Sequence, residues 1–170
     1  QIIGVHFLCQ PDTRILDFLH RIPSLEGLSF LSNRVHHLPE DIGQLNQLKL
    51  LALTATSIDK LPRSFQDLQL HELWMMNCQM EFCFPEICAL SQLEILVLRQ
   101  NNLSHLPDTF DKLQSLEILD LARNNLTEIP SVLWKLKNLK QLNLEENELT
   151  NDQIEAFKLT HPGCEVFFEW

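Results

Sequence analysis

The sequence lacks several features that common protein classes require. No run approaches the roughly 18 consecutive apolar residues of a membrane-spanning helix. Tyrosine is absent, and the 4 glycines lie far apart, so there is no glycine-rich loop to hold a phosphate. Lys and Arg number 13 against 23 Asp and Glu, and the net charge of −10 argues against nucleic acid and anionic membranes as ligands. We therefore predict no nucleic-acid partner and no membrane insertion.

Motifs of catalysis are also missing. The sequence contains no G-x-S-x-G, no H-E-x-x-H and no C-x-x-C. No nucleophile and base are brought together by the spacing of its residues. We expect no enzyme activity and no cofactor.

Leucine dominates what is present, with 34 of the 170 residues, and its spacing is regular. The pattern L-x-x-L-x-L-x-x-N/C-x-L-x-x-L-P recurs six times between residues 25 and 150, mostly at intervals of 23 residues. The second copy is one residue shorter. The third copy is the weakest, because Met75, Met80 and Cys83 take leucine positions and Pro85 comes one place late. Repeats of this length indicate a solenoid in which stacked copies bury leucines that one copy cannot bury alone.

The template resembles the leucine-rich repeat family, in its 23-residue form typical of intracellular and bacterial members. The resemblance implies an α/β fold, a curved horseshoe-shaped solenoid with a concave parallel β-sheet and helical or 3₁₀ segments on the convex side. It also implies a role in protein–protein interaction rather than catalysis. The family hosts many functions, so the resemblance specifies the fold more closely than the role.

The template also has a direct physical interpretation. The alternating L-x-L is a short strand with its leucines on one side. Apolar residues after each proline recur at about three-residue spacing, which predicts a helical or 3₁₀ return. The asparagine can donate to and accept from backbone groups of adjacent turns. We expect this ladder to be weaker where Thr56 and Cys78 replace the asparagine.

The chain is predicted to form a single domain, with a cap or degenerate repeat over residues 1–24, six repeats over 25–150 and a helix–strand cap over 151–170. The first strand is expected at residues 4–8 and the terminal helix at 151–159, with Asn151 or Asp152 as its cap. Residues 164–168 are predicted as the last strand. The apolar return of the first cap is assigned to Ile15, Leu16, Phe18, Leu19 and Ile22.

Residues between the leucines of each strand point out of the core and form the concave face. One column should contain His6, Ser29, Ala52, Trp74, Val97, Asp120 and Asn143. The next should contain Leu8, Leu31, Thr54, Met76, Arg99, Ala122 and Glu145. A third should contain Cys9, Ser32, Ala55, Asn77, Gln100, Arg123 and Glu146. The predicted partner-binding residues are Leu31, Trp74, Met76, Val97, Arg99, Asp120, Arg123 and Glu145.

Two parts of this face attract a functional interpretation. An exposed tryptophan beside a methionine is typical of an interface hot spot, although Trp74 packed flat on its neighbours is the alternative. Arg99, Asp120 and Arg123 would either contact a partner or form a local ion network. The sequence does not decide between these alternatives.

The positions of the histidines and cysteines favour structural roles over a metal-binding site. His37 and His105 occupy equivalent positions three copies apart, about 14 Å at the spacing of strands, so they cannot share an ion. The five cysteines include buried template positions and no flanking pairs. We expect no metal site and a reducing, cytoplasmic location, with a secreted bacterial effector or an extracellular protein as alternatives.

The leading hypothesis is a non-catalytic module that binds a protein partner through its concave face. One alternative is the recognition domain of a larger enzyme, such as a bacterial effector ubiquitin ligase, with its catalytic domain outside this chain. Another is an extracellular or envelope scaffold. Self-association through the exposed end strand and Trp74 is a further alternative.

Overall fold

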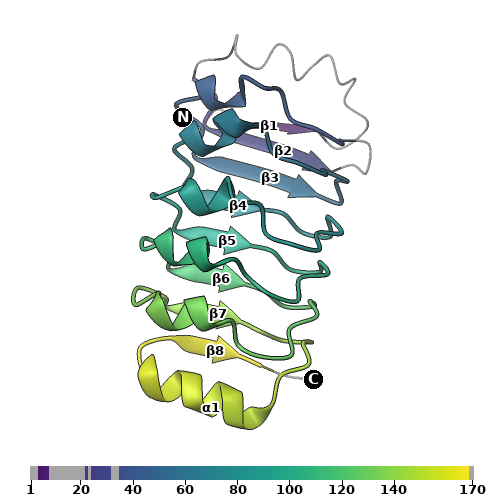
Figure 1. Cartoon of the computed structure of the whole chain (residues 1–170). Coiled ribbons are helices and arrows are strands. Elements are labelled where there is room, and N and C mark those ends of the chain that lie inside the picture. Colours follow the sequence, from purple (N-terminus) through teal and green to yellow (C-terminus); the bar gives the residue numbers. More distant parts are fainter. Residues whose placement is uncertain (1–3, 8–21, 23, 32–34, 169–170) are drawn as a thin grey trace.

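The computed structural model describes residues 4–7, 22, 24–31 and 35–168. In this part of the chain, eight short strands form one sheet in chain order, and every neighbouring pair is parallel (Figure 1). The strands are β1 (Gly4–Phe7), β2 (Gly27–Leu31), β3 (Leu50–Thr54), β4 (Glu72–Trp74), β5 (Ile95–Val97), β6 (Ile118–Asp120), β7 (Gln141–Asn143) and β8 (Glu165–Phe167). The predicted leucine-rich solenoid is confirmed.

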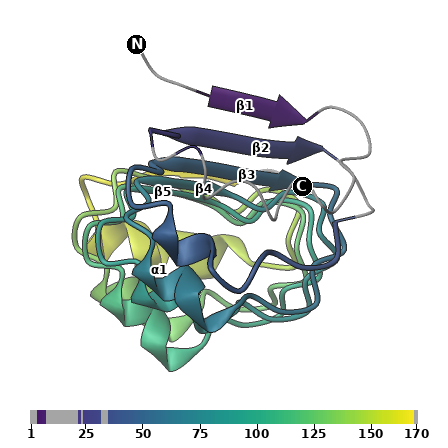
Figure 2. The same ribbon diagram turned by 90° about the horizontal axis from the view of Figure 1, so that it is seen from above.

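Helical segments cover the side of the sheet opposite its exposed face (Figure 2). All of the short ones are 3₁₀ helices, which resolves the choice between helical and 3₁₀ returns. They are η2 (Ile42–Gln44), η3 (Arg63–Asp67), η4 (Ile87–Ala89), η5 (Asp108–Lys112) and η6 (Ser131–Lys135), and the one α-helix among the described residues is α1 (Asn151–Thr160). Leucines from the strands and apolar residues from these helices meet in one continuous core.

The prolines of the template start the 3₁₀ turns. The carbonyl oxygen of Pro62 accepts from the Phe65 N–H at 2.9 Å, and that of Pro107 accepts from the Phe110 N–H at the same distance. Both phenylalanines are fully buried. Proline fits because its fixed φ precedes the turn and no partner is needed for a missing N–H.

The template asparagines form a buried ladder along the solenoid. The Asn124 side chain donates from Nδ2 to the carbonyls of Leu98 (3.0 Å) and Leu121 (2.9 Å) and accepts at Oδ1 from the Leu103 N–H (3.0 Å). The Leu121 carbonyl also accepts from Nδ2 of Asn147 at 2.9 Å. Each asparagine therefore joins its own repeat to the preceding one.

In the second and third repeats, Thr56 and Cys78 replace the asparagine of the ladder. The Cys78 thiol donates to the Leu53 carbonyl at 2.8 Å and lies 3.3 Å from the Thr56 hydroxyl. Burial raises the pKa of this thiol, which keeps its proton available for donation. A thiol is a weaker donor than an amide, and the lower strength of the ladder at this point stays a prediction.

The shorter second repeat is visible in the strand register. Leu51 pairs with Leu73 across β3 and β4, one residue fewer along the chain than separates the paired Leu28 and Leu51. The missing residue lies before β4, where Leu68 and Leu70 are closer together than their counterparts elsewhere. The leucines still face the core, because the deletion falls outside the strands.

The terminal helix begins one residue after its cap, Thr150. The Thr150 hydroxyl accepts from the Gln153 N–H, and the Gln153 side chain accepts from the Thr150 N–H at 2.8 Å. This reciprocal pair is a capping box, so the prediction of Asn151 or Asp152 as the cap was wrong. Inside the helix, Phe157 is buried beneath Trp134, with 5.2 Å between ring centroids.

At the start of the chain, β1 occupies the position predicted for the first strand. The apolar return expected at Ile15, Leu16, Phe18 and Leu19 lies outside the described residues. Ile22 is partly buried and packs against the core. The division of the chain into one domain with caps at 1–24 and 151–170 stays a prediction.

The chain leaves the sheet at a residue with a left-handed backbone conformation. This residue lies two places after the second leucine of the L-x-L pair. In five described repeats the φ of this residue lies between 51° and 60°: Ala55, Asn77, Gln100, Arg123 and Glu146. We predicted this third column as part of the concave face; its residues follow the strands or their ends, where the positive φ interrupts the alternation on which that prediction rests. A left-handed conformation costs a residue with a Cβ about 1 kcal/mol.

We expect Ala55→Gly to raise the free energy of unfolding by about 0.5–1 kcal/mol, since glycine accepts a positive φ without steric cost. Ala122 is a matched control, because it is fully buried and its φ is not positive. There the same substitution should lower stability by about 1 kcal/mol. Urea denaturation measures both, and a loss at residue 55 equal to that at residue 122 would contradict the conformational explanation.

Candidate protein-binding surface

The exposed side of the sheet carries the predicted first column in one continuous register. His6, Ser29, Ala52, Trp74, Val97, Asp120 and Asn143 pair in succession across the strands, and Phe167 of β8 extends the column. From Ser29 to Phe167, strand alternation places the side chains of this column on the face away from the leucine core. The spacing of the repeat thus predicts which residues are neighbours on this surface.

A second column of the same face was missed. The residues two places earlier also point to the exposed side, and those in the middle of the sheet are Glu72 and the apolar residues Leu50, Ile95 and Ile118. The three apolar residues are half-buried. We call Leu50, Ala52, Trp74, Ile95, Val97 and Ile118 the apolar band. Extending the strand alternation by one residue before the L-x-L pair would have predicted this second column.

Trp74 is the most prominent side chain of the apolar band. It is 36% exposed, and its indole N–H donates to a carboxylate oxygen of Glu72 at 3.3 Å. Its strand neighbour Val97 is only 7% exposed, so this predicted contact residue offers little surface to a partner. The accessible apolar surface at this level belongs mainly to Trp74.

The face becomes charged toward the C-terminus. Arg99 lies 3.6 Å from a Glu145 oxygen and 3.9 Å from an Asp120 oxygen, while Arg123 contacts Glu146 at 2.7 Å. Of the two alternatives for these charges, the local ion network is thus present. Whether they also contact a partner stays a prediction.

Burial raises the pKa of Asp120, although the Ala122 N–H at 2.9 Å and the Arg99 guanidinium both favour its ionised form. Desolvation, together with the nearby carboxylate of Glu145, outweighs the help from these two neighbours and leaves the pKa of Asp120 raised. Ionised Asp120 is therefore costly in the free protein, and a cation from a partner at this point would reduce the cost.

Two other predicted contact residues lie at the edge of this arrangement. Leu31, at the end of β2, is 46% exposed, and Met76 is half-buried just after β4. Leu31 lies two strands before Trp74 in the sheet. The predicted residues thus follow the sheet from β2 to β7 and do not converge on a single point.

A further exposed aromatic residue, Phe82, was not predicted. It is 51% exposed in the loop after β4, and its ring meets that of buried Phe84 edge-on, with 5.5 Å between centroids. The available signal was the irregular third repeat, with Phe82 and Phe84 on either side of a template position. This loop lies on the flank where the strands end.

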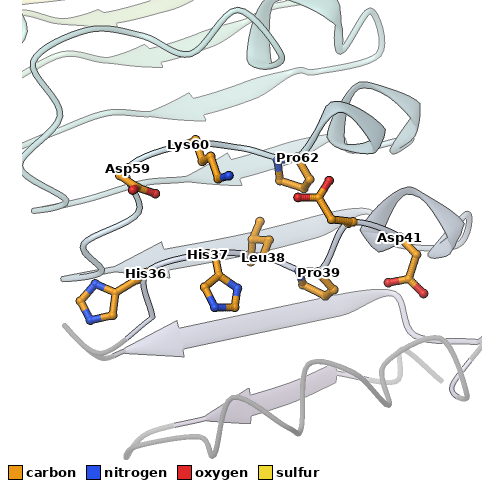
Figure 3. A pocket seen from close by; sticks show the side chains of 9 residues that line it. His36, His37, Leu38, Pro39, Asp41, Asp59, Lys60 and Pro62 are labelled. Atoms are coloured by element: carbon orange, nitrogen blue, oxygen red, sulfur yellow. The ribbon is translucent and has the colours of Figure 1, made fainter.

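A hollow of about 590 Å³ lies between the loops of the first two repeats (Figure 3). His36 and His37 come from one loop, and Asp59 and Lys60 from the next. Within the described residues, no group of three His, Cys, Asp or Glu side chains is placed to hold a metal ion. His105 borders other hollows, apart from His36 and His37.

The four cysteines of the described part, Cys78, Cys83, Cys88 and Cys164, are buried and free. The Cys83 side chain and the Thr109 hydroxyl lower the pKa of Cys88 to about 7 against the effect of burial. Cys9 lies outside the described residues. In the part of the chain that the structure covers, no helix has the length and apolar character to cross a bilayer.

Comparison with known proteins supports the architecture. The leucine rich repeat family model matches residues 90–149. A leucine-rich repeat protein of Leptospira interrogans is 32% identical, with a TM-score of 0.73 over 96% of this chain and 41% of its own. A search of curated proteins found no significant match.

Two more distant structures share the fold. An internalin of Listeria monocytogenes is 21% identical, with a TM-score of 0.67 over 96% of this chain and 47% of its own. Human trophoblast glycoprotein is 24% identical, with a TM-score of 0.72 over 86% of this chain and 60% of its own. The chain thus spans between 41% and 60% of these three structures. With its repeat, its sheet and these similarities taken together, the chain belongs to the leucine-rich repeat family.

Proposed function

We propose that the chain is a non-catalytic module that binds a partner protein on its concave face, with Trp74 at the centre of contact. Leucine-rich repeat folds commonly mediate protein–protein interaction, which supports the general role. The observation that carries the specific proposal is the exposed indole of Trp74 within the apolar band. Tryptophan is enriched among the few interface residues that carry most of the binding energy.

The surroundings of Trp74 also suit a contact of limited size. Glu72 fixes the indole by accepting its N–H, which reduces the side-chain entropy lost on binding. The ion pairs of Arg99 and Arg123 border the apolar band on its C-terminal side. An apolar centre with a charged border is the usual anatomy of a protein interface.

The test is an affinity capture with chemical crosslinking and mass spectrometry, followed by measurement of Kd with the purified partner. We expect Trp74→Ala to weaken binding at least about tenfold, because truncated hot-spot residues cost more than about 1.4 kcal/mol. Leu159→Ala is the matched control, since Leu159 is 83% exposed on α1, away from the sheet. It should leave Kd unchanged.

A folded Trp74→Ala protein whose Kd stays within about twofold of wild type would contradict the proposal. Crosslinks that map to the loops or to the 3₁₀ side would place the contact elsewhere. Since Trp74 is partly exposed and lies outside the core, the variant is expected to fold.

A further inference from the structure

The loop of the third repeat departs from the template and leaves one aromatic ring without cover. Regular repeats place one buried residue before the proline, whereas here both Cys83 and Phe84 are buried and Pro85 is displaced by one place. Gln79 adopts an extra positive φ of 58° that no other described repeat shows at this position. The chain between Gln79 and Phe84 consequently bulges, and Phe82 projects from it.

Phe82 forms one wall of a hollow of about 210 Å³ between this loop and the loop of the second repeat. The floor consists of Ile58, Met80 and Phe84, each no more than 5% exposed, so the edge of the core is accessible at this point. Asp59 and Glu81 lie at the rim. The volume is below the 300–1,000 Å³ typical of sites for drug-sized ligands, so it suits a single side chain.

Within the part of the chain that the structure describes, the two rim carboxylates are unpaired. Neither Asp59 nor Glu81 makes a hydrogen bond or an ion pair with the described residues, whereas Glu145 and Glu146 are each paired with an arginine. Lys60, the neighbouring cation, lines the hollow on the other side of its loop. The rim therefore presents uncompensated negative charge above an apolar floor.

Only a side chain with an apolar stem and a cationic end matches both halves of this hollow. Long cationic side chains bury their stems along apolar surface and keep the charge at its edge. A planar guanidinium can in addition stack on the face of an aromatic ring and bind carboxylates through two N–H groups at once. Arginine satisfies the floor, the rim and the Phe82 wall together.

We propose that this hollow binds one arginine side chain of a partner protein, with the stem on Ile58, Met80 and Phe84, the guanidinium against Phe82, and its charge opposite Asp59 and Glu81. The site lies on the flank formed by the loops after the strands, separate from the apolar band of the concave face. The test of this site is therefore independent of the function proposed for Trp74.

The test uses N-acetyl-arginine amide as the probe and follows the backbone amide signals of the protein by NMR. N-acetyl-citrulline amide is the matched control, because it has the same shape without the charge. We expect saturable shifts at residues 58–59 and 79–84 with arginine, and binding of citrulline at least about fivefold weaker. Asp59→Asn with Glu81→Gln should abolish the difference between the two probes, and Phe82→Ala should weaken arginine binding by at least about threefold.

Glu128→Gln removes an exposed carboxylate from a more distant loop and should change nothing. All of these residues are exposed, so the variants are expected to fold, and the dispersion of the amide signals verifies this. Equal shifts with citrulline would overturn the proposal. So would arginine-induced shifts spread evenly over other acidic segments, which would reflect only the net charge of −10.

Discussion

Asn124→Ala should lower the free energy of unfolding by about 3 kcal/mol. The substitution removes the hydrogen bonds that Asn124 donates to the carbonyls of Leu98, Leu121 and Ala122, and it leaves the Leu103 N–H without its acceptor. Each buried hydrogen bond contributes about 1 kcal/mol net, and an orphaned buried donor costs about 1–3 kcal/mol. Urea denaturation followed by circular dichroism measures the loss.

Two further variants separate the hydrogen bonds from the space that the side chain fills. Asn124→Asp preserves shape but directs a carboxylate at the carbonyl oxygens that accept from the amide, so it should cost at least as much at neutral pH. Asn125→Ala, at the exposed neighbouring position, should change stability by no more than about 0.5 kcal/mol. A stability of Asn124→Asp equal to wild type at neutral pH would contradict the role assigned to the amide.

The ladder also explains how much of the fold the sequence could predict. Asn101, Asn124 and Asn147 recur because each must donate and accept across two repeats, and only an amide does both. A requirement of that kind appears in a sequence as a fixed letter at a fixed interval. The same regular interval predicts the strand positions, the 3₁₀ turns after the prolines and the first exposed column.

Features that occur at only one position of the sequence were harder to predict than those that recur in every repeat. Thr150 caps the terminal helix because it lies one residue before the helix begins, and a run of Thr150, Asn151 and Asp152 offers three cap residues without indicating which is used. Leu50 and Ile118 belong to the concave face by the same alternation as Trp74, but they precede the L-x-L pair of the template, where we began the strand.

The two candidate binding surfaces differ in the same way. Trp74 occupies a regular position, so its exposure follows from the template. Phe82 is exposed because its repeat breaks the template, and no period predicts the shape of a bulge. The pairing of Arg99 with both Asp120 and Glu145 likewise needs side-chain geometry, because sequence neighbours on a sheet face only establish that contact is feasible.

Gly43→Ala should lower the free energy of unfolding by about 2–3 kcal/mol, even though alanine favours helical backbone over glycine. A Cβ at residue 43 would lie 2.3 Å from the backbone oxygen of Ser64 and 3.1 Å from Cβ of Asp67. A backbone oxygen cannot rotate away as a side chain can. The helices η2 and η3 would have to separate, and the core beneath them would loosen.

Gly163→Ala provides the matched control, because no atom lies within 4 Å of a Cβ at that position. It should leave stability within about 0.5 kcal/mol of wild type. A gain in stability for Gly43→Ala would show that helix propensity outweighs the close contact and would contradict the prediction.

The cause of the loss at Gly43 can be resolved further, since Gly43 also donates its N–H to the Ser64 hydroxyl at 3.2 Å. Ser64→Ala removes that hydrogen bond and the one that the Ser64 hydroxyl donates to the Glu40 carbonyl at 2.7 Å, without adding bulk, and we expect it to cost about 1–2 kcal/mol. Adding Ser64→Gly to Gly43→Ala should not restore stability, because the obstructing atom belongs to the backbone. Gln66, Asp111 and Trp134 stand at the same distance from their prolines in other repeats. The small residue is therefore a requirement of the contact between the first two repeats and not of the template, which is why the repeat pattern alone did not reveal it.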